Sequence, residues 1–350
     1  MKIIILTNVL SHGGAQRVAV TLANALSQKH EVYMMTFSHE SFYPLSERVN
    51  FITVGYGEMR KNGFWKPFTT MLARIRGYVF FSRFRLRERP DVTLSFLHNA
   101  DLLNLLALGG GGKRIMSERN NPSHKDKAYF REARFMFRFA DKVVFQSETV
   151  RNMYPAAIRR KGVIIPNPVS VSCKTVESRK KIVTCGRIHP QKNHRLLIRA
   201  FSAFVTDHPG YTLYIYGEGE SLKETEEVIA SLYLNDKVFI EGFKKDVHSY
   251  ISDAEMFVLS SDYEGMPNAL IEAMMMGIPC ITTAFEGSNE FFGGAEACLM
   301  TPIGDEAALA KAMGEVAENE ELRHKLASNG EALAQKYSVE YIASLWEKEF

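Results

Sequence analysis

Short apolar segments alternate with longer amphipathic stretches along most of the chain. Apolar segments rich in Val, Ile, Met and Phe predict buried β-strands, and stretches with apolar residues every three or four positions predict helices. In the N-terminal half, the expected strands are 2–7, 31–37, 49–54, 92–96, 141–146 and 161–165, and the first expected helix is 15–28. This alternation is typical of βαβ units, in which helices cover both faces of a parallel sheet.

A pair of prolines interrupts the alternation near the middle of the chain. Pro166 and Pro168 flank Asn167 and precede small polar residues, a composition typical of an exposed interdomain linker. Beyond it, the expected strands are 181–185, 211–216, 238–241, 256–260 and 279–283, and the expected helices are 193–206, 221–234, 246–254 and 269–276. We therefore predict two doubly wound α/β domains, 1–167 and 168–335, that face each other across a ligand-binding cleft. A helix within 336–350 is expected to pack back toward the first domain.

Length and composition agree with this organisation and exclude several function classes. The 350 residues exceed what a single hydrophobic core usually serves. A net charge of +3 and the lack of a recognition module argue against nucleic-acid binding. The four cysteines lack any Cys-x-x-Cys spacing, so we expect reduced core cysteines of a cytoplasmic protein, with neither disulfides nor zinc. Apolar runs are too short for a transmembrane helix, and the first residues predict a strand instead of a signal peptide.

The strongest candidate site lies at 260–273. An expected strand ends there, a turn with glycine and proline follows, and a helix begins near Asn268. The first turn of a helix offers N–H groups and a positive dipole end, which suit an anion or a set of hydroxyls. Glu264 lies in the turn and Glu272 about one turn into the helix, so each carboxylate could accept hydrogen bonds from a pair of sugar hydroxyls. The alternative is a surface turn with a solvated helix glutamate.

Two cations follow another expected strand. Arg187 and Lys192 lie on the loop after Gly186, where they could neutralise a diphosphate and stabilise it as a leaving group. Solvated loop charges are the alternative. Gly13 and Gly14 join the first strand to its helix and would let a ligand approach the backbone, although a plain tight turn also explains them. The third glycine of a Gly-x-Gly-x-x-Gly fingerprint is missing, which argues against dinucleotide binding.

Together these segments resemble the retaining glycosyltransferases of the GT-B fold, specifically family 4. The resemblance covers nearly the whole chain, and its motifs keep the family's order: Gly13-Gly14, Gly186-Arg187 with Lys192, Gly217-Glu218-Gly219, Glu241-Gly242-Phe243, and a Glu-x7-Glu signature from Glu264 to Glu272. The resemblance implies transfer of a hexose or N-acetylhexosamine from a nucleotide diphosphate sugar, with UDP preferred. It also implies retention through same-face attack assisted by the leaving phosphate, and no metal, in keeping with the lack of any Asp-x-Asp.

The resemblance implies roles for individual residues. Catalysis would rest on Glu264 at the transferred sugar and on Arg187 and Lys192 at the diphosphate, with Glu272 on the ribose. The implied donor site comprises Gly13, Gly14, Gly186, Arg187, Lys192, Gly217, Phe243, Glu264, Gly265, Met266, Pro267, Asn268 and Glu272. The expected acceptor site comprises Gln16, Arg17, Arg74, Arg76 and Arg119.

One position departs from the family pattern. Arg119 occupies the place where many relatives carry a histidine near the reacting sugar. An arginine cannot act as a base, so acceptor binding or leaving-group stabilisation is the expected role. A shifted alignment would make His98 or His124 the candidate, and an ordinary loop histidine is the alternative for both.

The segment 60–89 is basic and rich in aromatic residues. Its positively charged residues include Arg85, and its only acidic residue is Glu88. Aromatic residues, among them Phe81 and Phe84, are interleaved with these cations. We predict a basic amphipathic helix over 71–89 that binds an anionic membrane surface, and a domain helix with core-packed aromatics is the alternative.

Many family members extend lipid-linked saccharides, and 13–26 looks like bacterial enzymes that elongate polyprenyl-diphosphate oligosaccharides. The resemblance therefore implies such an acceptor, in cell-surface polysaccharide or lipopolysaccharide assembly, at the inner face of the cytoplasmic membrane. Two other function classes stay open. One is a different two-domain nucleotide-sugar enzyme, such as an epimerase or a phosphorylase, and the other is a non-catalytic membrane-associated scaffold.

Overall fold

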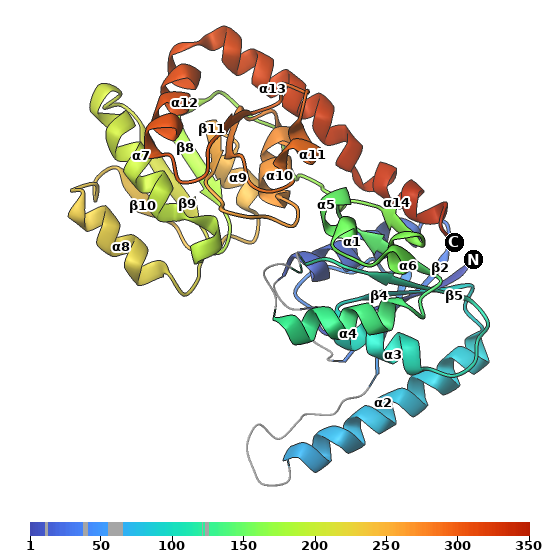
Figure 1. Cartoon of the computed structure of the whole chain (residues 1–350). Helices are drawn as coiled ribbons and strands as arrows, with labels where there is room; N and C mark the ends of the chain where they lie inside the picture. Colours follow the sequence, from blue (N-terminus) through green and yellow to red (C-terminus); the bar gives the residue numbers. More distant parts are fainter. Residues whose placement is uncertain (11–12, 38–40, 55–65, 121, 123–125) are drawn as a thin grey trace. The chain divides into compact units, whose positions relative to one another are not determined.

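The computed structural model describes residues 1–10, 13–37, 41–54, 66–120, 122 and 126–350. These residues form two compact units (Figure 1). The first unit comprises Met1–Pro168 and Val339–Phe350, and the second comprises Val169–Ser338. The chain therefore passes between the units twice, after Pro168 and before Val339. His124 and residues 60–65 of the basic segment lie outside the described residues.

In its described part, the first unit contains a parallel seven-stranded sheet in the order β3-β2-β1-β4-β5-β6-β7. Its strands are β1 (Lys2–Leu6), β2 (Glu31–Thr36), β3 (Val49–Thr53), β4 (Val92–Phe96), β5 (Lys113–Ser117), β6 (Lys142–Phe145) and β7 (Gly162–Ile164). The chain builds outward from β1 to β3 and then returns to the other side of β1 with β4. The topological switch point of this sheet therefore lies between β1 and β4.

Helices cover both faces of this sheet. They are α1 (Gly14–Leu26), α2 (Lys66–Glu88), α3 (His98–Leu106), α4 (Lys127–Phe137), α5 (Glu148–Asn152), α6 (Ala156–Arg159) and α14 (Val339–Glu347). Side chains of β1 alternate between the faces, as strand geometry requires. Ile3 and Ile5 join the core beneath α1 and α14, whereas Ile4 and Leu6 join the core beneath α2 and α3. This double coverage explains why the strands are almost continuously apolar.

The described part of the second unit contains a parallel six-stranded sheet in the order β10-β9-β8-β11-β12-β13. Its strands are β8 (Arg179–Cys185), β9 (Thr212–Tyr216), β10 (Val238–Ile240), β11 (Ala254–Leu259), β12 (Cys280–Thr283) and β13 (Leu299–Thr301). Its helices are the 3-10 turn η2 (Pro190–Lys192), α7 (His194–Asp207), α8 (Leu222–Ser231), α9 (Val247–Ile251), α10 (Asn268–Met276), α11 (Ser288–Phe292), α12 (Glu306–Glu318), α13 (Glu320–Ala334) and the 3-10 turn η3 (Gln335–Tyr337). Ile182 and Val183 point into separate cores on the two faces, so this sheet is also doubly wound.

The proline segment is not the exposed linker that its composition predicts. Asn167 and Val169 are buried. Asn167 Oδ1 accepts hydrogen bonds from Arg119 and Gln146, and Val169 N donates to the carbonyl of Tyr337 at 2.7 Å. The contacts of Asn167 lie within the first unit, and the contact of Val169 lies within the second. The segment is therefore anchored in both units instead of being exposed.

One expected helix is wrong in extent. The stretch 246–254 contains α9, which ends at Ile251, and Ala254 is already the first residue of β11. The intervening Asp253 accepts a hydrogen bond from the backbone N of Arg179, which draws the chain into the sheet beside β8. Within the described residues, no helix is long and apolar enough to span a membrane, and the four cysteines are free.

Helix α2 differs from the amphipathic helix that the sequence predicts. Phe81 and Phe84 are buried in the core of the first unit. Arg85 is also buried, and Nη1 of its guanidinium lies 3.4 Å from Oδ1 of Asn104. Burial lowers the pKa of Arg85 to about 10. The inner side of α2 is therefore an ordinary packing face, and only its outer residues can meet a ligand or a membrane.

Candidate active site

The switch point of the second sheet lies between β8 and β11, which are neighbours in the sheet although six elements, η2 to α9, separate them along the chain. In open parallel sheets, ligands bind outside the carboxyl ends of the strands at such a point. The loop 186–193 follows β8 there, and the loop 260–267 follows β11. The sheet order thus brings together the two segments that the sequence singles out.

A short ion pair joins these two loops. Lys192 Nζ lies 2.6 Å from Oε1 of Glu264, and the two side chains are only 17% and 6% exposed. Ser261 Oγ donates to the same carboxylate oxygen at 2.6 Å, and Gln191 Nε2 lies 3.4 Å from Oε2. A carboxylate and an ammonium group are therefore held side by side in a largely dehydrated place, where their charges act strongly on a bound substrate.

The loops are also braced behind this pair. Asn193 Nδ2 donates to Oδ1 of Asp262 at 2.9 Å, and Asp262 N donates to the carbonyl of Gln191. Asn193 has a left-handed backbone conformation with φ of 44°, and its side-chain oxygen caps α7 at Leu196 N. Asparagine suits both roles, because it tolerates left-handed φ and is a strong N-cap. Lys192 and Glu264 are thus positioned by both side-chain and main-chain contacts.

Glu272 lies eight residues after Glu264, inside α10, and it contacts His248. Nε2 of the ring is 3.1 Å from Oε2 of Glu272, and Nδ1 is 3.2 Å from the backbone N of Ser172. Since a backbone N–H can only donate, Nδ1 accepts, and the neutral ring carries its proton on Nε2 and donates it to the carboxylate. Ser172 Oγ in turn donates to Asp246 at 2.7 Å. The ring therefore fixes the orientation of the Glu272 carboxylate.

Cys185 is the buried last residue of β8, the strand that precedes the loop carrying Lys192. Burial raises the pKa of its thiol, the negative charge of Glu272 raises it further, and Lys192 and Lys181 oppose the rise. Glu264 lies in the loop after β11 and Glu272 lies in α10, so both carboxylates belong to the segment that follows this strand. The thiol is protonated and inert at neutral pH.

Close backbone approach explains the glycines beside these loops. A Cβ on Gly217 would lie 1.8 Å from the carbonyl oxygen of Gly186, and one on Gly219 would lie 2.1 Å from that of Ile188. The turn after β9 thus lies directly against the loop that carries Arg187 and Lys192. The same turn contains Glu218. Its Oε1 accepts a hydrogen bond from the backbone N of Phe243 at 3.4 Å.

The remaining expected donor residues line the start of α10 and the strand ends. Met266 and Pro267 are buried, Gly265 is partly exposed, and α10 begins at Asn268 with no side-chain cap among the described residues. Such a helix start can receive an anion. Arg187 is exposed and makes no ion pair with any residue that the structure describes, so its charge is available to a ligand.

In the first unit, Gly13 precedes α1 next to the switch point of that sheet. Its missing side chain leaves room for Gln16, whose Oε1 would lie 2.3 Å from a Cβ on Gly13. Gly14 is exposed, and Arg17 follows one turn into α1. These residues share one helix start, whereas Arg74 and Arg76 lie on the exposed outer part of α2. The expected acceptor residues therefore come from separate elements of the first unit, and their joint role stays a prediction.

Arg119 is buried at the end of β5. Its Nη1 donates to the carbonyl of Ile165 at 3.1 Å and to Asn167 at 2.9 Å, and its guanidinium lies 5.5 Å from the ring centroid of Trp346. Burial lowers the pKa of Arg119 to about 9. Its Nε and Nη2 have no hydrogen-bond partner among the described residues. Arg119 thus joins the loop after β5 to Ile165, Asn167 and Trp346. Its role in acceptor binding stays a prediction.

His98, the alternative candidate base, lies at the switch point of the first sheet. It follows Leu97, whose φ of 75° is unusual for a residue with a side chain and marks backbone strain of the kind found at functional sites. His98 Nε2 lies 2.5 Å from Oε2 of Glu132 in α4. Sequence reasoning missed Glu132 as well as His248 and Ser172, because each meets its partner only through tertiary contacts.

Two family models match the chain, one for each part. A model described as "Glycosyltransferase Family 4" matches residues 12–172, and a model described as "Glycosyl transferases group 1" matches residues 172–333. Together they account for nearly all of the chain.

Curated relatives match over almost their full length. A Campylobacter jejuni protein named GalNAc-alpha-(1->4)-GalNAc-alpha-(1->3)-diNAcBac-PP-undecaprenol alpha-1,4-N-acetyl-D-galactosaminyltransferase is 26% identical over 99% of this chain and 98% of its own. A second protein of that organism, named N-acetylgalactosamine-N,N'-diacetylbacillosaminyl-diphospho-undecaprenol 4-alpha-N-acetylgalactosaminyltransferase, is 26% identical over 95% of each chain.

Solved structures share the fold. HepE of Anabaena, crystallised with UDP and glucose, superposes with a TM-score of 0.83 at 18% identity, over 100% of this chain and 99% of its own. Sucrose-phosphate synthase from Thermosynechococcus elongatus gives a TM-score of 0.79 at 18% identity, over 100% and 98%. At this identity the likeness establishes the GT-B fold of two Rossmann-like domains and no more.

Proposed function

The chain belongs to the glycosyltransferases, with a family 4 N-terminal part and a group 1 C-terminal part, and from this premise we propose its reaction. It transfers a hexose or N-acetylhexosamine from a UDP-sugar to a polyprenyl-diphosphate-linked saccharide, with retention of the anomeric configuration. The observation that carries this proposal is the buried Lys192–Glu264 pair at the start of α10, eight residues before Glu272.

The charges of this pair match the charges that develop during transfer. The bond between C1 of the sugar and the diphosphate oxygen breaks, the acceptor oxygen bonds to C1 on the same face, and the acceptor proton passes to the leaving diphosphate. Positive charge builds on the sugar near Glu264, and negative charge builds on the diphosphate near Lys192 and Arg187. These two cations and the helix start neutralise the diphosphate, and we propose that no metal ion is needed.

Glu272 is assigned to the ribose of the donor. A carboxylate with two oxygens can accept from both ribose hydroxyls, provided that its plane is fixed. His248 supplies that restraint through the hydrogen bond to Oε2. UDP is the preferred carrier because a solved structure of the same fold holds UDP, and N-acetylhexosamine is supported by the names of the two Campylobacter relatives.

The acceptor assignment rests on those relatives and on α2. Both names give an undecaprenol-linked diphosphate saccharide as acceptor. The outer part of α2 exposes Arg74 and Arg76 beside apolar side chains, which suits an anionic membrane surface and the acceptor diphosphate. We therefore place the protein at the inner face of the cytoplasmic membrane, in cell-surface polysaccharide or lipopolysaccharide assembly.

Reconstitution tests the proposed reaction directly. The purified chain is incubated in buffer with EDTA, a panel of UDP-sugars and a polyprenyl-diphosphate disaccharide, and the product is analysed by mass spectrometry and NMR. We expect one added sugar in an α-linkage from an α-configured donor. An inverted linkage, a strict need for added metal, or transfer only to lipid-free saccharides would each contradict part of the proposal.

Replacing His248 with alanine is expected to raise KM for the UDP-sugar about tenfold, with kcat changed less than threefold. A hydrogen bond to a charged group contributes about 1.5–3 kcal/mol, and its loss removes one restraint on the orientation of the Glu272 carboxylate. Steady-state kinetics with a saturating acceptor measures the effect. His324→Ala is the matched control, because that exposed histidine also contacts a glutamate in the second unit. Equal KM values for both variants would rule out the positioning role.

A further inference from the structure

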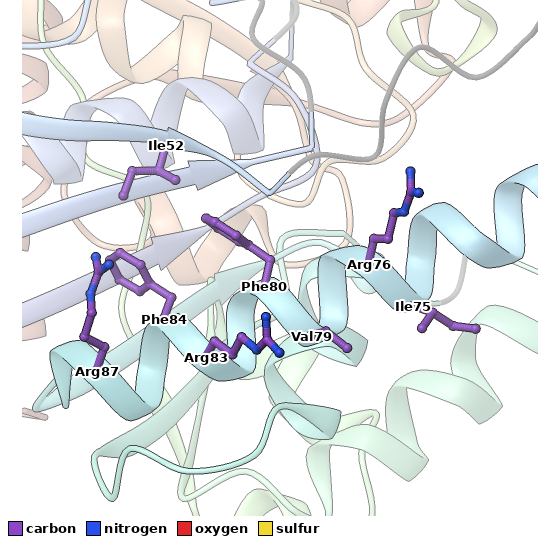
Figure 2. A pocket seen from close by; sticks show the side chains of 8 residues that line it. All are labelled: Ile52, Ile75, Arg76, Val79, Phe80, Arg83, Phe84 and Arg87. Atoms are coloured by element: carbon purple, nitrogen blue, oxygen red, sulfur yellow. The ribbon is translucent and has the colours of Figure 1, made fainter.

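A hollow lies between the outer strand of the first sheet and α2. Its volume is about 550 Å³, within the roughly 300–1,000 Å³ typical of small-molecule sites. It is lined by Ile52 of β3 and by Ile75, Arg76, Val79, Phe80, Arg83, Phe84 and Arg87 of α2. Figure 2 shows the rings of Phe80 and Phe84 on the side of α2 that faces Ile52, with arginines on either side of them. Among the described residues, the lining combines an apolar floor with a cationic rim and contains no acid.

The floor of this groove is more exposed than a protein interior. Phe80 is 42% exposed, Val79 39% and Ile75 50%. Phe84 is the buried residue of the groove lining. The centroid of its ring lies 5.1 Å from that of Tyr33. Soluble monomers rarely leave such contiguous apolar surface to water unless something binds there. The floor therefore favours an apolar occupant.

The rim indicates an anionic head on that occupant. Arg76 and Arg83 are exposed and make no ion pair with any residue in the described part of the chain, whereas Arg87 pairs with Glu88. The two unpaired arginines lie seven residues apart, which is two helical turns or about 10.5 Å along one face. Their long side chains can converge on one diphosphate between them.

We propose that this groove seats the first isoprenoid units of the polyprenyl carrier, with the diphosphate at Arg76 and Arg83. This inference rests on the proposed function and adds the recognition of the lipid itself. A second copy of the chain is a poor occupant, because two arginine rims would repel each other. Nucleic acid offers no apolar chain for the floor. A groove of this size takes one narrow chain near its head group and leaves the rest of a long polyprenyl chain in the bilayer.

Matched variants separate groove binding from general membrane attraction. Phe80→Glu places a carboxylate on the groove floor. Leu86→Glu adds the same charge at an exposed position of α2 that does not line the groove. We expect Phe80→Glu to raise KM for the polyprenyl-diphosphate acceptor at least tenfold and Leu86→Glu to leave it within twofold. Equal effects of both changes, or none, would overturn the groove assignment, and circular dichroism checks that both variants fold.

Photocrosslinking tests the groove independently of turnover. The probe is a farnesyl diphosphate that carries a benzophenone, added to the full chain in detergent and mapped by peptide mass spectrometry. We expect labels within 49–53 and 75–87, competed by farnesyl diphosphate and lost in Phe80→Glu but not in Leu86→Glu. Scattered labels, or equal competition by phosphatidylglycerol vesicles, would contradict an isoprenoid site. A chain that crosslinks there but transfers no sugar to a lipid-linked acceptor would contradict the proposed function alone.

Discussion

Replacing Glu264 with glutamine is expected to lower kcat by roughly 10²–10³-fold, the usual cost of removing one preorganised electrostatic group. The change keeps the size of the side chain, and Ser261 Oγ can still donate to the amide oxygen. What is lost is the negative charge that faces the sugar when positive charge develops on its ring. Because the charge acts mainly in the transition state, KM for the UDP-sugar should change much less than kcat.

Lys192 gives a different result on its own. Lys192→Met leaves the carboxylate of Glu264 without its cation in a site that is 6% exposed. Breaking a buried pair in this way costs about 3–5 kcal/mol of stability, because the remaining charge is uncompensated. This variant should therefore lose both turnover and thermal stability, and its kinetics alone would not separate the two effects.

The double variant Lys192→Met with Glu264→Gln separates them. Removal of both charges should restore most of the stability but none of the turnover, measured by calorimetry and by initial rates of transfer. Lys174→Met is the control, since Lys174 and Glu331 form an exposed pair elsewhere in the second unit and should matter for neither property. Recovered activity in the double variant would mean that the pair is only structural.

Most of the fold is predictable from the sequence because strand burial leaves a local pattern. The strand 92–96 coincides with β4, and the helix 269–276 differs from α10 by one residue. The site at Glu264 and Lys192 is also predictable, because each residue follows an apolar strand and parallel strands end at one edge of a sheet. The order of the strands makes β8 and β11 neighbours, and this order could not be predicted from the sequence of either segment.

Features that depend on tertiary contact could not be predicted. His248 and Glu272 are separated by 24 residues, and no local pattern joins them. On α2, Phe80 and Phe81 are adjacent and chemically identical, yet only Phe81 is buried, since the position of the helix on the sheet decides which side is covered. For the same reason, Arg85 is buried whereas Arg83 is exposed. The prediction of an exposed linker is wrong because Asn167 is buried and accepts hydrogen bonds from Arg119 and Gln146. The residues next to Asn167 in the sequence give no sign of these contacts.

The second large effect concerns stability and comes from Gly217. Replacing it with alanine is expected to destabilise the second unit by at least about 3 kcal/mol, at the upper end of overpacking costs. The new Cβ would lie 1.8 Å from the carbonyl oxygen of Gly186, a backbone atom that cannot rotate away as a flexible side chain can. The φ of 157° at Gly217 adds strain for a residue with a side chain. Calorimetry should show a Tm lower by about 6–12 °C for a unit of this size.

Gly314→Ala is the matched control for this prediction. Gly314 lies inside α12, and a Cβ there would meet His208 at 3.8 Å, an ordinary contact. Alanine in a helix is favoured over glycine by about 0.5–1 kcal/mol, so this variant should keep or raise the Tm. If Gly217→Ala matched Gly314→Ala in Tm, the two loops could separate without cost. The loop that carries Arg187 and Lys192 would then not depend on the turn after β9, and turnover of Gly217→Ala should stay near that of the unaltered chain.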